Sequence, residues 1–296
     1  GAQQQKVGDN EDQGAVFVFD NINGTWTMTQ EITATDGGAG DTFGSSIAFD
    51  GTTAVIGAYG AMIDAAPLGA AYVFTLADGT WTQTQKLTAD DSNPAGLLNF
   101  GFSVGLSGST ILVGADAATF GANDFQGAVY VFNETGGTWT QTQKFSGDDA
   151  GIGDIFGISL AFDGTNAVVG AYAQNQGTGA AYVFANSGGT FTQTQKLVAS
   201  DAATAAYFGG AVALSDSTIL IGSFSANPGG VDSQGAAYIF TNTGGIWTQT
   251  QELLADDGVA SDQFGRALAL DGTTALIDAP GAAGPEGPDA GTAYGA

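Results

Sequence analysis

One short segment, written GAAYVF at residues 69–74, recurs along this chain at nearly constant spacing. It occurs again at 179–184, and near-copies read GAVFVF (14–19), GAVYVF (127–132), GAAYIF (235–240) and, degraded, GTAYGA (291–296). Phe-Gly pairs begin at Phe43, Phe100, Phe156, Phe208 and Phe264, so that successive pairs are 57, 56, 52 and 56 residues apart. A repeat of this length predicts a chain built from copies of one supersecondary unit.

Each repeat contains four short segments that are rich in β-branched and aromatic residues and bounded by Gly and Asp, which predicts four β-strands. The Phe-Gly pair opens the first strand, and a run of small residues such as VIGA (55–58) ends the second. The GAAYVF segment is the third strand, and a segment such as WTQTQKL (81–87) is the fourth. Four-stranded units at a period near 56 residues are typical of a β-propeller, so the predicted fold class is all-β.

The fourth strand alternates strictly, which predicts that Trp81, Gln83, Gln85 and Leu87 face one way while the Thr and Lys residues face the other. One face would then lie against a neighbouring blade. The recurrent Trp of this strand is best explained by packing between blades. The small residues of the second strand predict an inner position, where backbone approaches backbone.

We predict a single β-propeller domain over residues 1–296, made of five four-stranded antiparallel blades. Four blades lie within the chain, at 43–87, 100–145, 156–197 and 208–253. The fifth is composite: residues 1–32 supply its third and fourth strands, and residues 264–280 supply its first and second. The alternative is a part of a six- or seven-bladed ring.

On this count residues 281–296 are surplus. They are a frayed tail, an exchange strand that adds to the next molecule head-to-tail, or a remnant of a longer protein. In the exchange alternative, the assembly residues would be Gly291, Thr292, Ala293 and Tyr294.

Charge and composition exclude several function classes. The chain has 30 acidic and 5 basic residues, a net charge of −25, which would repel nucleic acid and anionic membranes. No apolar run approaches the ~18 residues of a membrane span, so we expect no membrane insertion. Histidine and cysteine are absent, which removes the commonest general base and thiolate chemistry. No acidic residue is unique to one blade, and we therefore expect no enzyme activity.

The Phe-Gly pair followed by Gly-Ala within a four-stranded unit resembles the FG-GAP repeat of integrin α-subunit propellers. Linkers such as ATDGGAGDTFG (34–44) resemble still more those of bacterial exported FG-GAP proteins. The resemblance covers essentially the whole chain. It implies a propeller fold and an extracellular or cell-surface location. It does not assign an activity, because propellers host many activities.

Carboxylates recur in the loops that join blades, seven and two residues before the Phe. The candidate metal ligands are Asp36, Asp41, Asp149, Asp154, Asp257 and Asp262. One interpretation is Ca²⁺ binding or an acidic recognition rim, and the other is Asx-turn capping repeated with the blade. The calcium loop that integrins carry between first and second strands is absent, because each such loop here has at most one acid. Calcium is thus the single cofactor considered.

The loops between second and third strands vary most, and variable loops on a rigid scaffold often carry binding specificity. The candidate ligand-facing aromatics are Tyr59, Phe120, Phe125, Tyr172 and Phe224. They could stack on sugars or contact a partner, or cover the base of their own loops.

Three functions remain open. The first is a non-enzymatic extracellular structural or binding protein, self-assembling head-to-tail through the surplus strand. The second is a lectin-like or calcium-dependent adhesin that uses the face of the inter-blade loops. The third and least favoured is a carboxylate-based glycoside hydrolase. The expected partners are another copy of the chain or a cell-surface protein or glycan.

Overall fold

The computed structural model describes residues 1–91, 98–282 and 292–295. Apart from the short helical turn α1 (Gln174–Gly177) and the 3-10 turn η1 (Pro228–Gly230), its regular elements are β-strands. Tertiary contacts divide the chain into two compact units, residues 1–122 with 128–145, and residues 123–127 with 146–296. Neither helical turn in the described residues has the length and apolar character of a membrane span.

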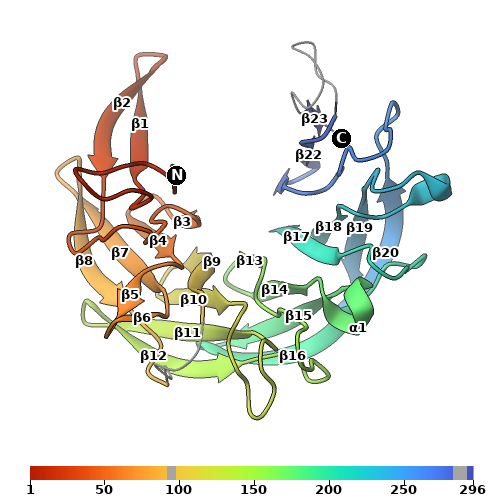
Figure 1. Ribbon diagram of the computed structural model, residues 1–296, viewed down its shortest axis with the longest axis horizontal. Helices are drawn as coiled ribbons and strands as arrows, with labels where there is room; N and C mark the ends of the chain where they lie inside the picture. The colour runs from red at the N-terminus through yellow and green to blue at the C-terminus, as the bar shows by residue number, and fades with distance from the viewer. Residues whose placement is uncertain (92–97, 283–291, 296) are drawn as a thin grey trace. The chain divides into compact units, whose positions relative to one another are not determined.

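The first unit contains a hairpin and two four-stranded antiparallel sheets (Figure 1). The hairpin is β1 (Val16–Ile22) and β2 (Thr25–Ile32). The first sheet has the order β3 (Ile47–Phe49), β4 (Thr53–Ala58), β7 (Ala70–Ala77), β8 (Thr80–Leu87), and a small ribbon, β5 (Met62–Ile63) and β6 (Ala66–Pro67), lies between β4 and β7 in sequence. The second sheet has the order β9 (Phe100–Ser107), β10 (Thr110–Ala115), β11 (Ala128–Thr135), β12 (Thr138–Phe145).

The second unit contains two four-stranded sheets and one of three described strands. Their orders are β13 (Leu160–Phe162), β14 (Asn166–Ala171), β15 (Ala180–Ser187), β16 (Thr190–Leu197); β17 (Phe208–Ser215), β18 (Thr218–Ser223), β19 (Ala236–Thr243), β20 (Ile246–Leu253); and β21 (Leu268–Asp271), β22 (Thr274–Ala279), β23 (Thr292–Gly295). Every strand pairing within these sheets is antiparallel, and it joins strands that follow one another in sequence, except that the β5–β6 ribbon separates β4 from β7. The predicted fold class is confirmed: the chain is all-β, with five blades of the β-propeller type that begin at β3, β9, β13, β17 and β21.

Each blade has two different faces. One carries the Tyr and Phe of the third strand and the Trp of the fourth, and the other carries smaller aliphatic residues. In the first unit, Tyr72, Phe74 and Trp81 pack against Val16 and Ile32 of the preceding hairpin. The rings of Tyr72 and Phe74 also meet Phe43 edge-on at 5.6 and 5.9 Å. The predicted role of the recurrent Trp in packing between blades is confirmed for Trp81, Trp139 and Trp247. Trp26 of the hairpin is exposed and is an exception.

Small residues are required where neighbouring blades approach on the second strand. A Cβ added to Gly57 would lie 2.0 Å from the carbonyl oxygen of Gly101 in the next blade, a distance that no side chain tolerates. Gly69 likewise makes a parallel bridge to Phe100 of that blade. The inner position predicted for the second strand is therefore correct.

Within each unit, glutamine side chains of a fourth strand bind the backbone of the following fourth strand. The amide of Gln30 donates to the carbonyl of Trp81 at 2.8 Å and accepts from its backbone N–H at 2.8 Å. Gln85 makes the same pair of bonds with Trp139, at 2.7 and 2.9 Å. The Gln side chain thus imitates one residue of a neighbouring strand, and we call this arrangement the glutamine clamp.

The structure differs from the sequence-based expectation at the C-terminus, where residues 281–296 were expected to be surplus. Within that segment β23 pairs with β22, and Tyr294 stands opposite Ile277. The Tyr294 ring meets Phe264 at 5.3 Å, and its hydroxyl donates to Asp257 at 2.7 Å. The segment forms a strand because the degraded copy keeps Tyr294, the residue that fills the space beside Phe264 of the Phe-Gly pair.

This pairing also changes the expected composite blade. The edge of β22 that residues 1–32 were expected to fill is occupied by β23, and within the described residues β1 pairs with β2. Of the four predicted assembly residues, Thr292, Ala293 and Tyr294 lie in β23, and Gly291 lies outside the described residues.

Candidate functional site

The inter-blade loops and the third and fourth strands together build a recurring trio of Asp, Tyr and Lys. Tyr72 and Lys86 stand opposite one another on β7 and β8, with the ammonium 5.4 Å from the ring centre. The same ammonium binds Asp36 of the preceding loop at 2.7 Å. A cation held between a carboxylate and an aromatic face gains from both interactions.

Two further blades repeat this arrangement. Lys144 lies 5.1 Å from the centre of the Tyr130 ring and 2.6 Å from Asp91. Lys196 lies 5.5 Å from the centre of the Tyr182 ring and 2.6 Å from Asp149. Three of the five basic residues of the chain are used in this way, so the trio is a property of the repeat.

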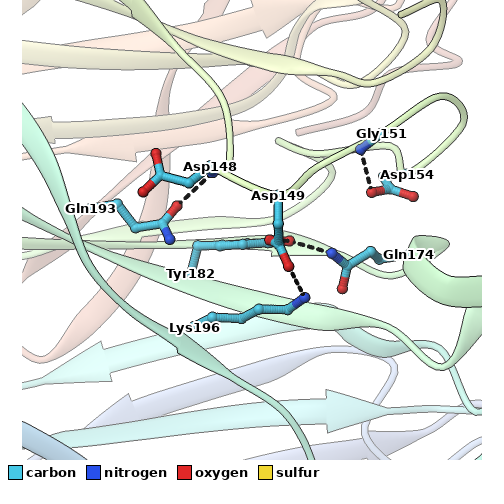
Figure 2. A network of polar contacts seen from close by, with 8 residues as sticks. All are labelled: Asp148, Asp149, Gly151, Asp154, Gln174, Tyr182, Gln193 and Lys196. Atoms are coloured by element: carbon cyan, nitrogen blue, oxygen red, sulfur yellow. Dashed lines mark hydrogen bonds and ion pairs between the residues drawn. The ribbon is translucent and has the colours of Figure 1, made fainter.

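The trio around Asp149 is the most extensive, and Figure 2 shows Lys196 and Tyr182 converging on its carboxylate. The Tyr182 hydroxyl donates to Oδ1 at 2.8 Å, and Lys196 donates to Oδ2 at 2.6 Å. Gln174, the first residue of α1, donates to the Tyr182 hydroxyl oxygen at 2.6 Å. Both carboxylate oxygens of Asp149 are therefore engaged.

These contacts explain how the groups titrate. Partial burial opposes ionisation of Asp149, but the hydrogen bonds from Lys196 and Tyr182 outweigh it and hold the pKa of Asp149 below its usual value. Burial, together with the Asp149 charge, raises the pKa of Tyr182 well above that of a free phenol. At neutral pH the trio is thus an ion pair with a neutral phenol beside it.

The second carboxylate of each loop caps the loop backbone. Asp41, Asp154 and Asp262 accept hydrogen bonds at 2.7 Å from the N–H groups of residues 38, 151 and 259, three positions earlier. Burial raises the pKa of both Asp41 and Asp154. Three of the six predicted metal-ligand residues, Asp41, Asp154 and Asp262, therefore bind within their own loops. The other three bind strand side chains of the following blade: Asp36 binds Lys86, Asp149 binds Tyr182 and Lys196, and Asp257 binds Tyr294. In the parts of the chain that the structure describes, no group of three or more acidic side chains is placed to hold a metal ion.

A polar pocket of about 380 Å³ opens beside the Asp149 trio. Its lining includes Asp154, Gln174, Asn175, Thr178 and Lys196. The pocket exists because α1 folds the short loop between β14 and β15 into a tight turn. Asn175 and Gln176 both have left-handed backbone there, with φ of 51° and 62°, a conformation that Asn tolerates better than most residues.

Two of the predicted aromatic residues come together in the second unit. Tyr172 and Phe224 lie 6.2 Å apart, and Tyr207 contacts both rings at 5.3 and 5.4 Å. Arg266 covers the Phe224 ring at 5.0 Å. The sequence prediction missed Tyr207 and Arg266, which lie in the segments that flank the Phe-Gly pair and not in the variable loops.

The other three predicted aromatics have separate surroundings. Tyr59 packs on Phe102 at 5.2 Å, Phe120 lies 5.7 Å from the Lys144 ammonium, and Phe125 is exposed. The pocket residues Gln174 and Asn175 were also missed. Their only signal was the short loop itself, YAQNQGT, which is the shortest of its kind in the chain.

Comparison with solved structures gives a similar fold in the structure of Pseudomonas aeruginosa periplasmic gluconolactonase, PpgL. The similarity has a TM-score of 0.54 at 17% sequence identity and covers 90% of this chain and 70% of that one. At this identity the likeness concerns the fold alone. A comparison with curated protein sequences gives no match.

The family model described as the FG-GAP repeat matches five segments, at residues 26–74, 81–132, 139–184, 191–240 and 247–295. Each match begins with the fourth strand of one blade and continues through three strands of the next. The fifth match ends within β23, in agreement with its place as a third strand. The five matches cover most of the sequence, and the chain belongs to the FG-GAP repeat family.

Proposed function

We propose that this chain is a non-enzymatic extracellular binding protein that recognises a neutral, hydroxyl-rich ligand, a glycan, in the pocket beside Asp149. The observation that carries the proposal is the composition of this pocket. It offers the amides of Gln174 and Asn175, the Thr178 hydroxyl and the Lys196 ammonium within about 380 Å³. Several hydrogen-bonding groups in one concave site are what recognition of a sugar requires.

The state of the charged groups supports binding over catalysis. A carboxylate that acts as nucleophile or general base needs an oxygen free to meet the substrate. Both oxygens of Asp149 are already bound by Tyr182 and Lys196. One oxygen of Asp154, Oδ2, accepts the Gly151 N–H. These groups present a preorganised polar wall, in which the Lys196 ammonium offsets one of the two carboxylates of the lining.

The test is a glycan microarray followed by calorimetry with the best ligand. In the Asn175→Gly variant, the left-handed backbone is kept while the side-chain amide is lost. We expect a loss of affinity of about tenfold or more, since one or two hydrogen bonds would disappear. The matched control is Asp64→Gly, which makes the same kind of change at a left-handed residue (φ 50°) in the first unit.

The control should bind as the wild type does. If no glycan binds above background, or if Asn175→Gly binds as tightly as the control, the pocket is not the site.

A further inference from the structure

The hairpin β1–β2 exposes the face that other blades bury. Trp26, Phe19 and Met28 are 69%, 53% and 52% exposed. At the same positions of the following blade, Trp81 and Phe74 are only 9% and 3% exposed, because they pack against the hairpin. The hairpin carries the contact surface of a third and a fourth strand, and no described residue of the first unit covers it.

An apolar groove continues this surface. It has a volume of about 430 Å³ and lies between the hairpin and the next blade, lined by residues that include Val18, Ile47, Phe49 and Trp81. In the blade that follows, Val104 and Leu106 stand where Ile47 and Phe49 stand here, and they are buried in a cluster with Val55 of β4. The groove is therefore the place that a first and a second strand fill elsewhere in the unit.

The last blade of the second unit presents the complementary features. Among the described strands it has no fourth, and Leu276 on β22 is 54% exposed, although Val55 at the same position is fully buried. On the preceding blade, Gln195 clamps the backbone of Trp247 at 2.6 and 2.9 Å. In the described part of the chain, Gln251 at the next clamp position has no such partner.

We propose that the β1–β2 hairpin of one copy docks onto a second copy as the third and fourth strands of its last blade, next to β22 and in place of β23. Gln251 of the second copy then clamps the backbone of Trp26, as Gln30 clamps Trp81. Leu276 enters the groove beside Ile47 and Phe49, as Val55 packs in the complete blades. The partner is thus another copy of this chain, recognised by strand addition.

The exchange breaks fewer contacts between strands than it forms. It breaks the four pairs between β22 and β23 and the bridge between Ala2 and Ala15. In return, β22 gains the six-pair ladder that β4 makes with β7, and the bulky Val18 takes the position of Gly295. A fourth strand is added as well. Because each copy offers one hairpin and one receiving blade, the association is head-to-tail and can extend to many copies.

This surface is independent of the glycan pocket, and it can be tested by cross-linking because the chain has no cysteine. In complete blades, a Gln stands at the position of Met28. Its side chain accepts a hydrogen bond from the backbone N–H of the residue three positions after the last strand of the preceding blade. Gln83, for example, accepts from the Thr35 N–H at 3.0 Å, and that preceding strand ends at Ile32. Met28 should therefore lie beside Asp256 of the partner. Two single variants, Met28→Cys and Asp256→Cys, are mixed with a short bismaleimide. Both positions are exposed, so neither change should disturb folding.

We expect cross-linked pairs only in the mixture, and ladders of higher species from the variant that carries both changes. Ile152→Cys, also exposed, is the control and should give background alone. No cross-link in the mixture overturns the proposal. A cross-link formed solely within one chain of the double variant also overturns it, because the hairpin would then dock on its own copy.

A second measurement uses the exposed Trp. Trp26→Asp should abolish the concentration-dependent increase in sedimentation coefficient that we expect of the wild type, and Trp26→Phe should retain it. The thermal midpoint should be unchanged in both variants. If Trp26→Asp associates as the wild type does, the hairpin face is not the interface.

Discussion

Glu252 stands opposite Tyr238 across the β19–β20 ladder, in the position that Lys196 takes opposite Tyr182 in the preceding blade. The Tyr238 hydroxyl still donates to Asp201, at 3.2 Å. In place of an ion pair, this blade therefore brings two carboxylates toward one phenol. Burial and the charge of Asp201 raise the pKa of Glu252 above its usual value.

Replacing this acid should stabilise the fold. A group whose pKa is raised in the folded state is destabilising once it is ionised, so stability is lost as pH rises through its titration. We expect Glu252→Lys to raise the free energy of unfolding by about 0.5–1 kcal/mol at pH 7, the scale of an exposed ion pair. Glu252→Gln should give a smaller gain. Both gains should shrink as the pH falls below the usual pKa of Glu, because Glu252 then becomes protonated in the unfolded state as well. Urea denaturation at pH 7 and pH 4 measures them, and equal stability of all three proteins at pH 7 would contradict the account.

The opposite change should weaken the Asp149 trio. Lys196→Met keeps the length of the side chain but removes its charge. Because the pKa of Asp149 is lowered in the folded state, its contribution is present above the usual pKa of Asp and is lost as pH falls through the lowered value. We expect a loss of about 1 kcal/mol at pH 7 that disappears in acid. Lys6→Met removes the exposed partner of Glu11 and serves as control. It should change stability by less than about 0.5 kcal/mol, and equal losses in the two variants would argue against a special role of the trio.

The glutamine clamp gives a further prediction. Gln85→Met keeps the shape of the side chain but removes both hydrogen bonds to the Trp139 backbone. We expect a loss of about 1–3 kcal/mol, because a partly buried N–H and carbonyl would be left without partners. Thr84→Ala, one residue away on the exposed side of the same strand, is the control. Similar denaturation midpoints for the two variants would show that the clamp adds little.

Ile155 offers a stabilising change of a different kind. It immediately precedes Phe156 and has a left-handed backbone with φ of 61°, which is costly for a β-branched residue. Asn99 takes the same position in another blade with φ of 53°. We therefore expect Ile155→Asn to stabilise the protein by about 1 kcal/mol. A calorimetric melt tests this, and a lowered midpoint would mean that the Ile155 side chain contributes more by packing than its backbone costs.

The sequence predicted the repeat, its four strands and their faces, because these depend on periodic burial and on turn residues that lie close together in the chain. It did not predict the place of β23. That depends on one Tyr fitting beside Phe264, and the flanking Gly295 suggested decay of the copy. The glutamine clamps were missed as well, since alternation showed which way Gln85 points but not that its amide meets a backbone.

The candidate site was less predictable. The recurrence of Asp36 and Asp149 marked the inter-blade loops, but their partners come from the third and fourth strands of the next blade. The pocket itself depends on the left-handed turn at Asn175, and no sequence motif predicts this turn. Calcium binding therefore stays a prediction for these loops. It is the direct alternative to a purely structural role of their carboxylates.

Thermal denaturation of the wild type with calcium and with chelator tests the central claim, which is that the inter-blade carboxylates are structural groups bound by their own loops and by strands of the following blade. A site filled at a hundred times its dissociation constant would add about 2.7 kcal/mol of stability. We expect midpoints that agree within about 1 °C at equal ionic strength, since the change in stability would be close to zero. A saturable rise of several degrees with calcium, abolished in a variant such as Asp154→Asn, would contradict it.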